Sequence, residues 1–203
     1  MESSHEDRIE VAFGAALPDL ASMAGTRLDK AGLSGGVRAG VALHHRTDAV
    51  FHSLVEFRAG VQHLAEQLKA SGLATGPSRA VAHAGWELLL DGCLLERAGV
   101  ERDFTAVLDG GPDVADAVSP ADPERWRRLL TAMRSERWWL GYGDPELVAR
   151  ALQRRLSTRS RLSFSVAELP LVAEALVLAK PDVGRAVGPI LEGVVAGVAA
   201  VDD

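Results

Sequence analysis

Residues 77–98 read PSRAVAHAGWELLLDGCLLERA, and this stretch decides the class of fold. Its apolar residues recur three and four positions apart, which is the spacing of one face of an α-helix. The same spacing runs through the rest of the chain, and no segment alternates in the manner of a β-strand. The pattern therefore predicts an all-α protein.

Helix breakers divide the rest of the chain into pieces of helix length. The spacing predicts helices over 18–29, 34–52, 54–71, 77–98, 99–109, 121–138, 144–157, 167–179 and 182–200. Asp122 and Asp144 each precede a proline, so each is predicted to cap a helix that begins with that proline. Leu17-Pro18 and Lys180-Pro181 are predicted to lie between helices, because proline interrupts the backbone hydrogen bonds of a helix.

The composition bounds the class of protein. With 203 residues, of which 47% are hydrophobic, the chain can bury a sizeable core as a single domain, and we expect a helical bundle. Its one cysteine, Cys93, rules out a disulfide framework and a cysteine-based zinc site. The polar first residues are not those of a secretory signal, and the apolar tract 186–201 is short for a membrane span. We therefore expect a cytoplasmic protein without a membrane partner, in which this tract is buried or forms a homodimer contact.

The charge is unevenly distributed. A net charge of −6 argues against general nucleic-acid binding, yet residues 125–161 contain ten arginines against three acidic residues. One interpretation is a set of solvated helix faces. The other is a surface that receives an anionic substrate or an acidic partner, since guanidinium groups match phosphate and carboxylate.

Two helical stretches carry residues that could bind a metal ion. In GVALHHRTDAVFH, residues 40–52, His44, Asp48 and His52 are four residues apart and share one helix face. His83, Glu87 and Asp91 repeat this spacing, among apolar residues that would partly desolvate the carboxylates. Two such helices packed together predict a His/carboxylate site for a divalent ion in the core of the bundle. The alternative is a buried hydrogen-bond network without a metal.

Several stretches resemble the acyl carrier protein phosphodiesterase family, which is related to the HD-type phosphohydrolases. They are Leu17 to Leu20, Gly40 to His52, Trp86-Glu87 and Met133 to Leu162, in the same order as in that family. The resemblance implies an all-helical, metal-dependent enzyme that removes phosphopantetheine from acyl carrier protein. The chain departs from the family in lacking its N-terminal helix and in having Leu88 where a histidine follows the acidic residue.

The resemblance also implies roles for particular residues. Asp19 matches the aspartate of the family's leading turn, and His44, Arg46 and Asp48 match a motif of the form Gly-x-x-x-His-x-Arg-x-Asp. Glu136, Trp138, Tyr142 and Asp144 match a downstream pattern, and Arg159 and Arg161 fall on its arginine-rich turn.

Together these observations predict a metal-dependent phosphoester hydrolase, a phosphodiesterase in particular. The predicted metal ligands are Asp19, His44, Asp48, His52, His83 and Glu87, and Mn²⁺ or Mg²⁺ is favoured, with Fe²⁺ or Zn²⁺ as alternatives. Asp91, or alternatively Asp19, is the predicted general base, Arg46 contacts either phosphate or a carboxylate, and Arg159 and Arg161 bind the substrate phosphate. Its substrate would be a phosphorylated small molecule or acyl carrier protein. The alternatives are a metal-binding protein without hydrolysis, and a catalytically silent helical protein whose arginine-rich face docks an acidic partner.

Overall fold

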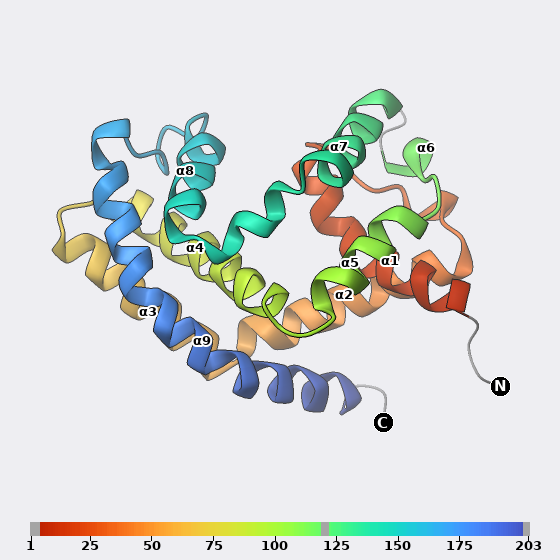
Figure 1. Ribbon diagram of the computed structural model, residues 1–203, viewed down its shortest axis with the longest axis horizontal. Helices are drawn as coiled ribbons and strands as arrows, with labels where there is room; N and C mark the ends of the chain where they lie inside the picture. The colour runs from red at the N-terminus through yellow and green to blue at the C-terminus, as the bar shows by residue number, and fades with distance from the viewer. Residues whose placement is uncertain (1–4, 119–121, 201–203) are drawn as a thin grey trace. The chain divides into compact units, whose positions relative to one another are not determined.

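The structure is a computed structural model that describes residues 5–118 and 122–200 (Figure 1). Within these ranges the regular elements are all helices, which confirms the predicted all-α class. The chain divides into two compact units, one of residues 1–49 and 99–137 and the other of residues 50–98 and 138–203. The single domain expected from the chain length stays a prediction.

Each unit is built from helices of two separate stretches of chain. The first contains α1 (His5–Met23), the 3-10 helix η1 (Lys30–Gly32), most of α2 (Gly35–Ser53), α5 (Val100–Gly110), α6 (Ala115–Val118) and α7 (Pro123–Glu136). The second contains the end of α2, then α3 (Val55–Ala70), α4 (Thr75–Leu95), the 3-10 helix η2 (Trp138–Gly143), α8 (Pro145–Leu156), the 3-10 helix η3 (Val166–Glu168) and α9 (Leu169–Ala199).

In the first unit, α1 and α2 cross in direct backbone contact. A Cβ atom on Gly40 would lie 2.1 Å from the carbonyl oxygen of Val11, so only glycine fits at this crossing. The buried Phe13 of α1 then packs edge-on against the buried Trp126 of α7, with ring centroids 6.5 Å apart. The glycine contact and the aromatic pair together fix α1 within this unit.

In the second unit, α3 and α4 form an antiparallel pair joined by residues 71–74, and α9 packs against both (Figure 1). The pair is close because α3 carries glycine at the contact: a Cβ on Gly60 would lie 2.4 Å from the ring of Trp86. Trp86 is 2% exposed and belongs to the core of this unit, as do Phe57, Leu64 and Leu176. This packing sets the spacing between α3 and α4, whose side chains line most of the cavity described below.

Proline positions are the main difference from the predicted helices. Pro18 lies inside α1 and Pro181 lies inside the single helix α9, so the predicted breaks at these two places are wrong, while Pro189 lies inside a helix as predicted. A proline within a helix costs about 3 kcal/mol. Here the buried apolar face continues on both sides, as Leu17 and Leu20 show in α1, and this burial offsets the lost hydrogen bond.

The predicted caps of two helices are confirmed. Asp122 accepts a hydrogen bond from the backbone N–H of Arg125 at the start of α7, and Asp144 accepts one from the backbone N–H of Glu146 at the start of α8.

None of the helices in the described part of the chain has the length and the apolar character of a membrane span.

Candidate metal centre

The centre begins with two residues one turn apart on α4. His83 and Glu87 are four positions apart, so their side chains share one face of the helix. The Nε2 atom of His83 lies 3.2 Å from Oε1 of Glu87. Helix geometry alone therefore brings an imidazole and a carboxylate together.

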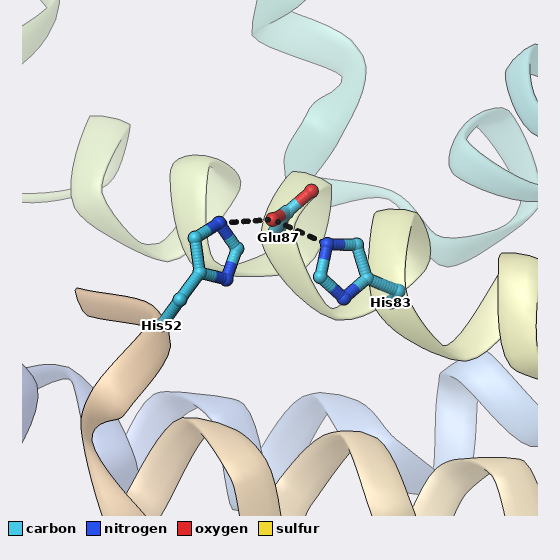
Figure 2. A group of neighbouring side chains, drawn as sticks. All are labelled: His52, His83 and Glu87. Atoms are coloured by element: carbon cyan, nitrogen blue, oxygen red, sulfur yellow. Dashed lines mark ion pairs between the residues drawn. The ribbon is translucent and has the colours of Figure 1, made fainter. Parts of the chain in front are cut away.

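A second imidazole comes from the last turn of α2. The Nε2 atom of His52 lies 3.6 Å from the same Glu87 oxygen, and its ring stacks on that of His83 with centroids 5.2 Å apart and an interplanar angle of 7°. Figure 2 shows both rings directed at the Glu87 carboxylate. Three side chains from two helices thus converge at one point.

An aromatic side chain holds the two imidazoles in place. The buried Phe57 of α3 meets His52 edge-on at 5.0 Å and His83 edge-on at 5.5 Å. Phe57 in turn packs edge-on against Trp86 at 5.8 Å. The ring orientations are therefore set by the core of the second unit rather than by solvent-exposed contacts.

The three residues fit a divalent metal ion. One ligand atom from each lies within 4.8 Å of the others, and theirs is the only such group of three or more among the described residues. Ligand atoms about 2.1 Å from a tetrahedral ion lie about 3.4 Å from one another, which falls between the two N···O distances found here. Three protein ligands also leave a position for water or substrate.

The centre is accessible, and this corrects the expectation of a site in the core. The side chains of His52, His83 and Glu87 are 33%, 50% and 32% exposed. They lie outside the hydrophobic core because the apolar face of α4 turns towards α3 and α9, which leaves the polar stripe at the edge of that interface.

A cavity of about 700 Å³ adjoins the centre, and His52 and His83 are part of its wall. Three basic residues from α3 and α4 also line it, namely Arg58, Lys69 and Arg79. Among the described residues, no hydrogen bond or ion pair involves the side chain of any of these three. The cavity therefore combines a metal-ligand set with cations that are available to an anion.

The predicted ligands of the first unit form a different arrangement. Nδ1 of His44 lies 3.0 Å from the carbonyl oxygen of Ala15 and 3.9 Å from Oδ2 of Asp19. Asp48 is exposed on α2, one turn after His44. His44 and Asp19 are thus brought together as predicted, but they belong to a different unit from His52. A single centre with all six ligands stays a prediction.

Other predicted site residues lie apart from the cavity wall. Asp91 is exposed on α4. The pKa of Tyr142 is raised to about 12, mainly because the phenol is buried and further because of the negative charge of Asp91. Arg159 and Arg161 are exposed after the end of α8. None of these three is among the cavity-lining residues described, and Arg46 is in the first unit. Their predicted roles stay predictions.

The arginine-rich segment 125–161 is divided between the two units. Its first five arginines lie in the first unit and its last five in the second. Among the described residues, two pair with acidic residues on their own helix, Arg127 with Glu124 at 2.8 Å and Arg150 with Glu146 at 3.5 Å, whereas Arg134 and Arg137 pair with Asp109 and Glu101 of α5. Such local pairs are what solvated helix faces would show.

Four residues of the site were not predicted from the sequence: Phe57, Arg58, Lys69 and Arg79. Arg79 could have been found, since it precedes His83 by four residues as His83 precedes Glu87. The three residues of α3 carry no such signal, because their relation to the histidines exists only once α3 packs on α4.

Comparison with known proteins gives no relative: no protein-family model, curated protein or solved structure matches the chain. The stretches that resemble acyl carrier protein phosphodiesterases fall in both compact units, with residues 17–20 in the first and Trp86-Glu87 in the second. That resemblance stays a prediction.

Proposed function

We propose that this protein is a metal-dependent phosphoester hydrolase whose divalent ion is held by His52, His83 and Glu87. The observation that carries the proposal is the convergence of two Nε2 atoms on one carboxylate oxygen, beside a cavity lined by cations that make no ion pair with any residue that the structure describes. Phosphate esters are the anions that such a combination of metal ligands and basic side chains suits best.

The exposure of the three residues argues against a purely structural role. An ion pair that is this accessible to solvent contributes about 0–1 kcal/mol to stability, so the cluster adds little to the stability of the fold. Its geometry is nevertheless set by the buried Phe57. Precise positioning of accessible polar groups is what a ligand site requires.

Each residue has a defined task in the proposed reaction. A bound divalent ion would supply a water of lowered pKa and polarise the phosphoryl oxygen. His52 and His83 provide neutral Nε2 donors, Glu87 provides the negative charge, and Arg58 orients the phosphate. Asp91, one turn beyond Glu87 on α4, is the proposed general base on the four-residue spacing alone, since it is not among the residues that line the cavity.

The donor set also bears on the ion and the substrate. Two imidazoles and one carboxylate suit Zn²⁺, Fe²⁺ or Mn²⁺ better than Mg²⁺, which prefers oxygen ligands. We keep acyl carrier protein as a proposed substrate on the resemblance alone, with the arginines of segment 125–161 as its proposed contacts.

Elemental analysis and a hydrolysis assay test this proposal together. Native protein should take up about one equivalent of Zn²⁺ or Mn²⁺ and hydrolyse p-nitrophenyl phosphate or bis(p-nitrophenyl) phosphate. The His52→Ala/His83→Ala variant should lose both while remaining helical by circular dichroism. His63→Ala is the matched control, because His63 is exposed on α3 and pairs with Gln67 at 3.1 Å.

The opposite result would favour the second class of function. Native protein that stays metal-free after incubation with Mn²⁺, Fe²⁺ and Zn²⁺ overturns the hydrolase proposal and leaves a catalytically silent binding protein. Metal uptake without hydrolysis of either ester would leave a metal-binding protein.

A further inference from the structure

The cavity beside the centre extends well beyond what a single phosphate group needs. Its volume of about 700 Å³ is in the range of sites for whole small molecules. Its wall on α3 runs from Phe57 and Arg58, which are next to the imidazoles, to Lys69 in the last turn of that helix. At 1.5 Å per residue, the twelve steps from Phe57 to Lys69 span about 18 Å.

The two ends of this cavity carry positive charge. Arg58 follows Phe57, which contacts both imidazoles, so it lies at the end with the metal ligands. Lys69, in the last turn of α3, lies towards the other end of the cavity, and Arg79 lies one turn before His83 on α4, between Lys69 and the metal ligands. Separate positive ends suit a ligand with two separate anionic groups.

The wall between these ends is partly apolar. Phe57, Val61 and Ala65 line the cavity and are four residues apart on α3, so they form one continuous strip along the helix. Glu66 is the one acidic residue of this wall, and it accepts a hydrogen bond from the side chain of Gln62 at 2.9 Å. Lys69 and Arg79 against this one carboxylate leave a net positive charge on the part of the wall beyond the imidazoles.

From this arrangement we infer that the substrate is an extended molecule with a phosphoester at one end, an apolar middle section and a second anionic group at the other end. The phosphoester lies at His52, His83 and Arg58, and this part of the inference rests on the proposed function. The middle section covers Val61 and Ala65. Lys69 and Arg79 bind the second anion, whether carboxylate or phosphate.

Binding of alkane-diyl bisphosphonates tests the inference, since these probes resist hydrolysis. Isothermal titration calorimetry would compare them, over a series of chain lengths, with alkyl monophosphonates of the same lengths, using both metal-free and Zn²⁺-loaded protein. At the matching length the bisphosphonate should bind about tenfold more tightly than the monophosphonate. Lys69→Gln should reduce this preference about fivefold, to about twofold, and should leave monophosphonate binding and metal content unchanged.

Arg97→Gln is the matched control, because Arg97 is exposed just after α4 and does not line the cavity. Equal affinity for the two probes at every chain length would overturn the inference, as would a Lys69→Gln variant that keeps the full preference. Neither result bears on metal uptake or on hydrolysis of the nitrophenyl esters, so failure of the proposed function is recognised separately.

Discussion

Each of the two compact units carries histidines beside a carboxylate, and the two groups differ in which ring nitrogen meets which partner. In the second unit, the Nε2 atoms of His52 and His83 both approach one oxygen of Glu87. In the first, Asp19 approaches Nδ1 of His44, and that atom already faces the carbonyl oxygen of Ala15. Matching residue types therefore produce converging ligand atoms in one unit and not in the other.

The neighbours of the histidines differ as well. In the first unit the ring of His45 packs edge-on against that of His44, and its Nε2 atom lies 3.2 Å from Nζ of Lys30. A cation therefore already lies beside the imidazoles. In the second unit both imidazoles approach the Glu87 carboxylate and are bordered by the uncharged Phe57, although Arg58 and Arg79 also line the adjoining cavity. We therefore expect the first arrangement to repel an added divalent ion more strongly than the second.

The largest expected effect is on metal affinity. His83→Ala should weaken Zn²⁺ binding by more than about a hundredfold, because it removes a direct ligand where loss of a supporting group alone costs 10- to 100-fold. His44→Ala should leave the affinity within about twofold of native. Titration against a competing chelator measures both. Equal losses in the two variants would contradict the contrast between the units and support a shared centre with all six predicted ligands.

The sequence predicted the second group of residues but not its contrast with the first. The four-residue spacing selected His52, His83 and Glu87 as candidate metal ligands, because a helix places such residues on one face whatever it packs against. The same spacing selected His44 and Asp48 equally strongly. It could not show which ring nitrogen each histidine presents, since this depends on backbone and side chains that are distant in sequence, such as Ala15.

Other features depend on packing and left no pattern in the sequence. The apolar spacing predicted most helices to within a few residues, but continuous helices through Pro18 and Pro181 required knowledge of what their apolar faces bury. The role of Phe57 as a support for both imidazoles likewise appears only when α3 meets α2 and α4. The division into two units is also invisible in the spacing, since α2 contributes to both.

A smaller effect concerns the glycine contacts that build each unit. Gly40→Ala should destabilise the protein by about 3 kcal/mol, because the new Cβ meets the backbone of α1, which cannot move aside. Gly60→Ala should cost about 1–2 kcal/mol, since the Trp86 ring can shift, and it should also weaken metal binding by displacing Phe57. Denaturant unfolding followed by circular dichroism measures the free energies.

Gly184→Ala is the control for these two changes. Gly184 lies inside α9 with nothing within 4 Å of an added Cβ, so alanine should stabilise the protein by about 0.5–1 kcal/mol through helix propensity. Similar losses of stability at Gly40 and Gly184 would show that the backbone contact of α1 with α2 is not what Gly40 serves.

The smallest expected effect is the titration of His45. Burial lowers its pKa below 6.5, and the neighbouring Lys30 lowers it further. The folded protein therefore binds fewer protons at this site than the unfolded chain, so the contribution to stability is present above pH 6.5 and is lost as the pH falls below it. Lys30→Gln should raise the pKa of His45 towards 6.5 in an NMR titration. An unchanged His45 pKa would show that the charge of Lys30 does not act on this ring. The expected repulsion of a metal ion in the first unit would then have to come from another residue.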